Sequence, residues 1–513
     1  MESHHGEIQE LARPTSPPPP QNIGDEPPKT EETKKDYHKG CPGCQLEEAN
    51  EIRTGIPYLN FFYICIIGLT STLPIQSLFP YLYFMIRDMN IAKQEEDIGF
   101  YAGFVGASYF FARIFSSVPW GIFADKYGRK PCIVISMLSV IVFNTLFGLS
   151  TRYWMAIVSR GLLGMLCGIL GPIKAYATEV CRKEHQALGM SLVTSSRAIA
   201  FVVGPAIGGF LAQPAEKYPH IFSKESIFGR FPYFLPCFTI SILAMGSCIA
   251  CIWLPETLHF HNDGKVGSAD EEAQISEEVE AQVGLSNIEA GVSSDTSLKN
   301  LLMNWQFVSS VIIYCTFSLH DVAYLESFSF WAASKRKFGG LSLTSQDLAI
   351  VLTISGAGVL VYQFVVYPFI VKYFGPIRPL RPAAILSILL LTTYPFMHNL
   401  QGLELKVLIN IASILKNVLS ATTTTACNIL QNTAVPQKQR GAANGISVTV
   451  LSLFKGVGPA GAGTLFSWTQ KHVTGLFLPG DQILFLVISM VAVVGLFMTF
   501  KPFFSMSNAL GRS

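Results

Sequence analysis

The chain has 513 residues, of which 50% are hydrophobic and only 14% are charged, against about 25% charged residues in an ordinary soluble domain. Its formal net charge is +2 and its mean hydropathy is +0.38. This balance excludes a disordered protein, a collagen-like fibre and a basic nucleic-acid binder, and it disfavours a soluble enzyme because too little polar surface is available to face water.

The first segment, residues 1–56, is polar and acidic, with 11 acidic and 6 basic residues. Because it contains four consecutive prolines and no apolar core, we predict a disordered tail rather than a signal peptide. The first hydrophobic segment is therefore expected to remain as a membrane span. Cys41 and Cys44 are the only motif-like pair among eleven cysteines, and most of the others lie in apolar runs, where a free cysteine acts as a small hydrophobe.

Twelve apolar segments follow, and each approaches or exceeds the roughly 20 residues that a helix needs to cross a bilayer. They span about 57–86, 98–123, 131–150, 153–178, 187–212, 232–254, 305–331, 346–371, 380–399, 404–432, 442–468 and 482–504. We predict an all-α membrane protein with an N-terminal six-helix bundle (57–254) and a C-terminal six-helix bundle (305–504). An acidic connector (255–304) joins them, and a short tail (505–513) follows.

The two halves resemble each other in sequence. Gln186-Ala-Leu-Gly189 leads into a segment with Gly204-Pro205, and Arg440-Gly-Ala-Ala443 leads into a segment with Gly458-Pro459. Such internal duplication is typical of secondary transporters, which rock two helical bundles about a central site. Basic residues are almost evenly divided between the two sets of loops, so the positive-inside rule does not fix the orientation. The acidic, unprocessed N-tail favours a cytosolic location for both termini.

The loop between the second and third segments reads Gly121-Ile-Phe-Ala-Asp125-Lys126-Tyr-Gly128-Arg129-Lys130. It resembles the G-x-x-x-D-R/K-x-G-R-K/R loop of the major facilitator superfamily. The resemblance implies a conformational latch made of Gly121, Asp125, Lys126, Gly128, Arg129 and Lys130. The alternative is an ordinary positively charged loop. The corresponding loop of the second half departs from the pattern, since Lys372 stands opposite Asp125 and Pro376 opposite Arg129.

Two further motifs lie inside the first bundle. Gly204, Pro205, Gly208 and Gly209 resemble the superfamily motif associated with antiporters, although a packing kink without directional meaning is the alternative. Arg160, in Ser159-Arg160-Gly161, resembles a fourth-span arginine linked with proton coupling. A buried arginine needs a partner, and the alternative is a structural arginine that snorkels to the interface.

More specific signatures narrow the resemblance. Cys41-Pro42-Gly43-Cys44 and Pro255-Glu256-Thr257-Leu258-His259-Phe-His261 are similar to two signatures of the plant zinc-induced facilitator-like family. The similarity covers about residues 38–504. It implies the major facilitator fold and a role in zinc or iron homeostasis. Members of the family are implicated in moving nicotianamine and mugineic-acid phytosiderophores, and others in potassium and auxin fluxes.

The signatures also raise the question of a metal site. Cys41, Cys44, His259 and His261 offer two thiolates and two imidazoles to Zn²⁺, provided that the tail and the connector meet in the cytosol. Ordinary zinc sites keep both pairs within one module, whereas these are more than 200 residues apart. A structural contact between tail and connector, and a redox or trafficking role, remain alternatives. We expect no resident cofactor.

Charged residues inside apolar segments are candidates for transport chemistry because they are costly in a membrane. His320, Asp321 and Glu326 lie close together in the seventh segment, and Lys416 lies near the centre of the tenth. With Arg160, they are our candidates for proton coupling or substrate binding, and a satisfied polar network is the alternative. Further basic residues could bind an anionic substrate or pair with lipid phosphates and helix ends: Arg113, Arg197 and Lys455.

These observations predict a proton-coupled antiporter that exports a small metal-chelating solute by alternating access. A proton-coupled potassium or organic-anion exchanger is the first alternative, and a metal-sensing membrane protein is the second. An enzyme is not expected, since no cluster has the spacing of a nucleophile and its base. The expected partners are a small-molecule substrate, protons and the lipid bilayer, without nucleic acid. We expect a monomer in the plasma or vacuolar membrane.

Overall fold

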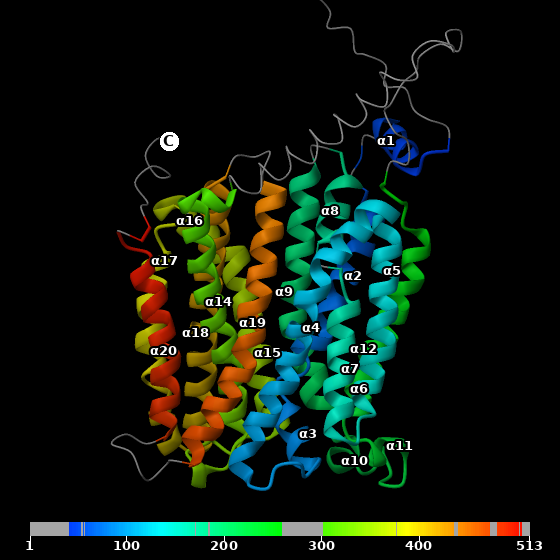
Figure 1. Cartoon of the computed structure of the whole chain (residues 1–513). Helices are drawn as coiled ribbons and strands as arrows, with labels where there is room; N and C mark the ends of the chain where they lie inside the picture. The colour runs from blue at the N-terminus through cyan, green and yellow to red at the C-terminus, as the bar shows by residue number, and fades with distance from the viewer. Residues whose placement is uncertain are drawn as a thin grey trace, which may run out of the picture.

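The computed structural model describes residues 40–52, 55, 57–169, 171–182, 185–258, 301–375, 377–435, 440–471, 480–501 and 503–504. Within these ranges the regular elements are all helices. This is the expected result for apolar segments, because a helix satisfies its own backbone hydrogen bonds in lipid. The long helices stand side by side in one bundle (Figure 1).

The first half contains the helices of residues 57–254. They are α2 (Tyr58–Gln76), α3 (Leu82–Asp88), α4 (Ile98–Tyr127), α5 (Arg129–Ser139), α6 (Thr145–Gly148), α7 (Tyr153–Leu166), α8 (Pro172–Glu179), α9 (Gln186–Leu211), α10 (Pro214–Lys217), α11 (Ile227–Arg230) and α12 (Phe234–Ala250). A π-helical turn, Val140–Asn144, joins α5 to α6.

The second half contains the helices of residues 305–504. They are α14 (Trp305–Ala333), α15 (Ser345–Val361), α16 (Tyr367–Phe374), α17 (Leu380–Leu391), α18 (Gly402–Thr433), α19 (Arg440–Lys471) and α20 (Gly480–Met498). A π-helical turn, Tyr362–Val366, joins α15 to α16.

Each of the twelve predicted segments contains helix, and the first is divided into α2 and α3 by a turn at residues 77–81. In the described chain ten helices are long and apolar enough to cross a membrane, and two shorter apolar helices, Tyr153–Leu166 and Gln482–Met498, occupy the fourth and twelfth predicted segments. The fourth segment is broken between α7 and α8 because the Trp120 side chain approaches there. Its Nε1 donates to the Met165 carbonyl at 2.8 Å, and a Cβ on Gly168 would lie 2.1 Å from its ring.

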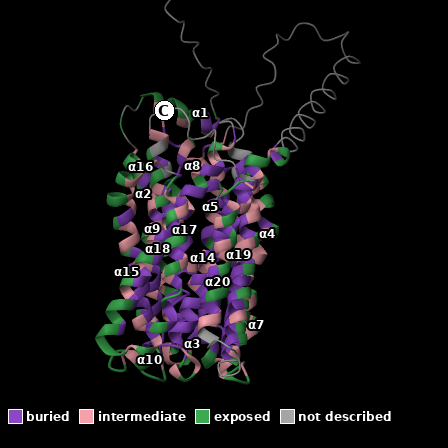
Figure 2. Cartoon of the chain, turned by 90° about the vertical axis from the view of Figure 1, so that its left-hand side faces the viewer, coloured by how far each residue is buried: buried purple, intermediate pink, exposed green. Residues whose placement is uncertain are grey.

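The outside of the bundle is apolar, as a lipid-facing surface requires. Large side chains such as Phe115, Phe364 and Met490 are exposed there, while the buried residues run along the inside of the helices (Figure 2). In water such a surface would be an aggregation hazard. In a bilayer it is the surface that contacts the lipid chains.

One prediction about the N-tail is corrected by the structure. Residues 42–52, inside the segment expected to be disordered, form helix α1 (Pro42–Ile52). The Asn50 side chain anchors it by donating to the Val180 carbonyl at 3.3 Å, and Leu46 packs on the apolar core of the first half. We call the end of the bundle that carries α1 the tail end, and the opposite end, with α3, α10 and α11, the loop end (Figure 1).

Candidate functional site

The two halves meet along helices α4 and α19 and along α9 and α15, where small residues allow close contact. A Cβ on Gly103 of α4 would lie 2.4 Å from the Pro459 carbonyl, and one on Gly463 of α19 would lie 2.3 Å from the Gly99 carbonyl. On the other side of the bundle, a Cβ on Gly209 would lie 2.1 Å from Ala349. These glycines let the helix backbones touch between Gly103 and the loop end.

Opposite charges reinforce this closure at the loop end. Lys335 of the second half contacts Glu95 of the first, and Lys471 lies 2.6 Å from Asp97. Lys217 donates to the Gly209 carbonyl at 2.6 Å and to the Ser345 hydroxyl of the second half at 2.7 Å. Each of the two exposed ion pairs stabilises by only about 0–1 kcal/mol. Together with the hydrogen bonds of Lys217, they hold the two halves at this end.

Toward the tail end the close contacts run out. Their last members are Gly456 of α19, whose Cβ would lie 3.4 Å from the Phe111 ring, and Gly356 of α15, whose Cβ would lie 2.5 Å from the Phe201 carbonyl. The glycine contacts between the halves therefore lie between the loop end and these two positions.

Asp321 and Lys416 come together at this middle level, within the second half. The Lys416 ammonium lies 3.4 Å from Asp321 Oδ1 and 4.5 Å from the centre of the Tyr324 ring. The Ser420 hydroxyl donates to Asp321, and the Thr424 hydroxyl donates to its Oδ2 at 3.3 Å. The Lys416 side chain is fully buried, whereas that of Asp321 is 22% exposed. The pair is thus a buried cation held by a carboxylate that water can reach.

The other two candidates of α14 lie elsewhere. His320 turns into the second half, where its Nδ1 bonds the Ile488 carbonyl at 3.0 Å. Glu326 lies at the contact between the halves, since a Cβ on Gly106 of α4 would lie 2.9 Å from its Oε1. It is only 2% exposed, and its Oε2 has no hydrogen-bond partner among the described residues. His320, Asp321 and Glu326, which lie close together in sequence, are therefore at three separate places in the structure.

Arg160 of α7 lies inside the first half. Its Nη1 donates to the Pro74 carbonyl at 3.0 Å, and its guanidinium stacks on the rings of Tyr109 and Phe147 at 5.5 and 5.2 Å. Since it is 2% exposed, it does not snorkel to the interface. Glu326 is the carboxyl group of the other half that acts on it electrostatically.

The latch loop is built around Gly128, whose φ of 110° favours glycine. Glu256 fills the space beside it, and its carboxylate accepts from the Arg129 and Lys130 backbone N–H groups, both at 3.0 Å, at the start of α5. The Arg129 side chain pairs with Glu179 of α8 at 3.2 Å. Glu179 belongs to the first half, and Glu256 lies at the start of the connector, directly after that half.

The remaining latch residues are less constrained. Lys126 is exposed, and nothing lies within 4 Å of a Cβ built on Gly121. The Asp125 side chain and Pro376 lie outside the described residues. The turn itself recurs in the second half, because Gly375 also has a positive φ, of 77°.

The glycines of the Gly204-Pro205 motif pack α9 between two neighbours. A Cβ on Gly204 would lie 2.5 Å from Gln76, and one on Gly208 would lie 2.0 Å from the Ser77 carbonyl, both at the end of α2. Gly209 faces α15 of the other half. The motif therefore lies at a contact that any relative movement of the halves must change.

The Cys/His motifs are only partly described. Cys41 and Cys44 are buried on α1, at 5% and 4% exposure, while His259 and His261 lie outside the described residues. No group of three potential metal ligands occurs within the described ranges. The proposed zinc site therefore stays a prediction.

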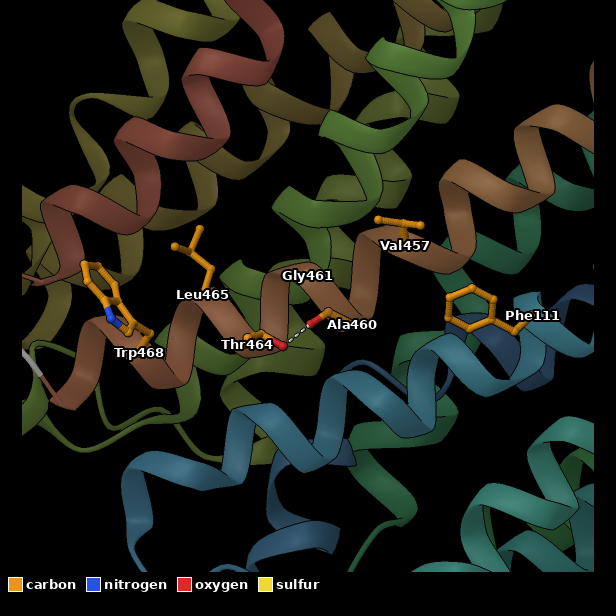
Figure 3. Close-up of a pocket in the computed structure, with 7 residues that line it drawn as sticks. All are labelled: Phe111, Val457, Ala460, Gly461, Thr464, Leu465 and Trp468. Atoms are coloured by element: carbon orange, nitrogen blue, oxygen red, sulfur yellow. Dashed lines mark hydrogen bonds between the residues drawn. The ribbon is translucent and has the colours of Figure 1, made fainter.

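A groove of about 500 Å³ lies on α19 and is unrelated to these charges. Its lining is apolar except for Thr464, whose hydroxyl donates back to the Ala460 carbonyl at 2.7 Å (Figure 3). Without a charged side chain in its lining, it is not a site for a charged solute.

Sequence reasoning missed several of these polar partners. Ser420 and Thr424 follow Lys416 at intervals of four residues, so one face of a helix carries all three, and that periodicity could have found them. Glu256 stood in a recognised signature, but its contact with the latch depends on two segments 126 residues apart. Only the fold brings them together.

A family model and known proteins match this chain closely. The model of the Major Facilitator Superfamily matches residues 64–459. The Arabidopsis thaliana protein ZINC INDUCED FACILITATOR 1 is 50% identical over 475 residues, covering 93% of this chain and 98% of that protein. ZINC INDUCED FACILITATOR-LIKE 1 from the same plant is 49% identical over 470 residues, covering 92% and 97%.

Solved structures agree on the fold. A D-xylose–proton symporter superposes with a TM-score of 0.62 and 13% identity, covering 88% of this chain and 98% of that protein. At that identity the likeness shows the architecture of two helical bundles and nothing about the substrate.

Proposed function

The chain belongs to the major facilitator superfamily and, within it, to the plant zinc-induced facilitator-like family, and from that premise we propose that it is a proton-coupled antiporter. As a member of this superfamily it is a multi-pass membrane transporter and not an enzyme. Its solute would be a small metal chelator of the nicotianamine or phytosiderophore type, exported from the cytosol in zinc and iron homeostasis.

One observation supports the coupling above all others: Glu326 is buried at the contact between the halves with an unpartnered Oε2. A carboxyl group in that position can exchange a proton with water only when the halves separate at its level. Proton release and uptake would thus follow the movement that carries the solute, which is the requirement for coupling. Arg160, across the contact, would stabilise the ionised form when it arises.

Asp321 and Lys416 would form the second element of the mechanism. The carboxylate is reachable by water and the ammonium is not. A cationic group of the solute, or a proton, can therefore compete with Lys416 for Asp321. His320, turned away into the second half, would act by positioning α14 against α20.

The movement itself would be the rocking of the two halves described for this architecture. We assign the tail end to the cytosol, in the plasma or vacuolar membrane. The latch residues and the Gly204-Pro205 motif would then set the balance between states open to either side. The cysteine and histidine motifs would report metal status at the cytosolic face.

The test is transport into proteoliposomes, with an imposed pH gradient and a panel of nicotianamine, deoxymugineic acid, Zn²⁺ and K⁺. We expect the gradient to drive accumulation of a chelator by the natural protein and not by Glu326→Gln, with Glu225→Gln at an exposed site as the matched control. Flux that ignores the gradient would exclude proton coupling.

An organic-anion exchanger is the second candidate, because unpaired basic side chains line the contact between the halves. It is recognised by anion flux in the same panel without any chelator flux. A sensor without transport would show neither, and its response would depend on residues 259–300 of the connector.

A further inference from the structure

Three basic side chains lie at one level of the bundle, just beyond the closed part of the interface. Arg113 follows Phe111 on α4 by two residues, and Lys455 precedes Gly456 on α19. Arg197 precedes Phe201 on α9 by four residues, or about 6 Å at 1.5 Å per residue. All three stand within about 6 Å along their helices on the tail-end side of these glycine contacts.

These side chains are near enough to act on one another. Lys455 feels the charges of Arg197 and Arg113, and Arg197 feels that of Arg113. Lys174 of α8 is under the influence of both arginines and lies exposed toward the tail end. Two arginines of the first half therefore face a lysine of the second.

None of the four side chains makes a hydrogen bond or an ion pair within the described part of the chain. Arg113 is nevertheless only 8% exposed. The carboxylate that acts on Lys455 is Asp321, and it is already engaged by Lys416, Ser420 and Thr424. An unpaired cation is costly inside a membrane, so a group of them is incomplete without an anion.

We propose that Arg113, Arg197 and Lys455 bind a solute with two or three carboxylate groups, and that repulsion between the cations of the two halves keeps the tail end open until that anion arrives. The inference rests on the transport function proposed above and names the site for its solute. Arginine forks bind carboxylates with two parallel hydrogen bonds, and three cations on three helices match separate carboxylates of one molecule. A potassium ion would be repelled.

The same site explains why closure of the tail end requires a bound solute. Tilting the halves together at the tail end moves Lys455 toward Arg113 and Arg197, which is unfavourable in a low dielectric. A bound polycarboxylate reverses the sign of that interaction. The empty protein would therefore resist closure at the tail end.

Binding can be tested on the purified full-length protein by calorimetric titration with tricarballylate, without any proton gradient. We expect saturable binding of tricarballylate and none of its uncharged trimethyl ester. Arg113→Gln, Arg197→Gln and Lys455→Gln should each weaken binding about tenfold or more, as the loss of a charge-assisted hydrogen bond implies. Arg113→Lys should retain part of the affinity, and Lys93→Gln, at an exposed site, should match the natural protein.

Two outcomes would overturn the proposal, and a third separates it from the proton coupling. If Lys93→Gln weakens binding as much as Arg113→Gln, the anion responds to net charge and not to this site. If inorganic phosphate binds as tightly as tricarballylate, the group is a general anion or lipid-headgroup site and not a polycarboxylate site. Binding that persists in a protein whose flux ignores the pH gradient would leave this site intact and reject only the proton coupling.

The proposed repulsion between the cations of the two halves is tested by a distance measurement at the tail end. Spin labels introduced through an unnatural amino acid at the exposed Tyr127 and Tyr373, near the ends of α4 and α16, report the opening of the tail end. We expect tricarballylate to shorten their distance, and Arg113→Gln with Arg197→Gln to shorten it without ligand. An unchanged distance in both experiments would reject the repulsion.

Discussion

The two ends of the contact between the halves differ in the signs of the charges that face each other. At the loop end the first half offers acids, Glu95 and Asp97, and the second half offers lysines, Lys335 and Lys471. On the tail-end side of the closed zone the first half offers Arg113 and Arg197, and the second half again offers a lysine. Opposite charges attract at one end and like charges repel at the other. In the proposed gating, the acids and bases that the first half carries at each level determine which end of the contact closes in the empty protein.

Glycines strengthen the same contrast. At the loop end they bring backbones together across the interface, as at Gly103 and Gly463. At the tail end Gly128 of the latch serves a turn, and the space beside it is filled by Glu256 at the start of the connector. Glycines therefore have different roles at the two ends: they allow contact between the halves at the loop end and a turn at the tail end.

The largest expected effect comes from replacing Asp321, which lies between the closed loop end and the basic group of Arg113, Arg197 and Lys455. Asp321→Asn leaves the fully buried Lys416 without a carboxylate and adds an uncompensated cation next to the basic group. Breaking a buried pair costs about 3–5 kcal/mol, somewhat less here because Asp321 is partly exposed. We expect a marked fall in the midpoint of thermal unfolding and loss of transport.

The double variant separates stability from function. Asp321→Asn with Lys416→Gln removes both charges, so it should recover most of the thermal midpoint while transport stays absent. A single variant as stable as the natural protein would show that the pair does not hold α14 and α18 together.

A larger side chain at a single glycine should disrupt the close contact between the halves near the loop end. Gly463→Val places its Cβ within 2.3 Å of the Gly99 carbonyl, and overpacking of this kind costs about 1–3 kcal/mol. We expect the loop end to open and transport to fall about tenfold. Gly461→Val on the same helix is the matched control, because nothing lies within 4 Å of its Cβ. Equal losses in both variants would mean that helix propensity, not cross-half contact, explains the effect.

The sequence predicted the helices much better than the site. Hydrophobic runs locate the helical segments because lipid imposes helical structure on any long apolar segment, but they do not show that the first and fourth are each broken into two helices. A hydrophobic run does not show which side of a helix faces the other half. For this reason His320, Asp321 and Glu326 were predicted to form one group, whereas the structure places them in three environments. The motif of Arg160 was recognised, but its partner, the Pro74 carbonyl, lies 86 residues away in the last turn of α2, where helix carbonyls have no partner within the helix. Pairings such as Glu95 with Lys335 depend on tertiary structure alone.

A smaller effect tests whether the latch belongs to one half only. Glu256→Ala removes the acceptor of two backbone N–H groups at the start of α5, and such a capping loss costs about 1 kcal/mol. We expect a modest decrease in the thermal midpoint, with Glu225→Ala at an exposed site as the control. The loop-end distance between labels at Ser223 and Leu403 should stay unchanged. A shift in that distance would show that the latch acts across the interface in this state.

The smallest expected effect is a pH dependence of closure at the loop end. Burial lowers the pKa of Lys217 from its ordinary value to about 8, against the opposing effect of Glu216. In an open state the solvated Lys217 side chain would have its ordinary pKa of about 10.5. Between pH 8 and 10.5 the open state therefore binds more protons than the closed state. Raising the pH through this window should therefore favour closure, and little change is expected below it. We expect the distance between labels at 223 and 403 to shorten from pH 8 to 10 in the natural protein and in Lys224→Met, but not in Lys217→Met. A response that survives Lys217→Met would assign the pH dependence to other groups and leave the loop end held by its acid–lysine pairs and glycines.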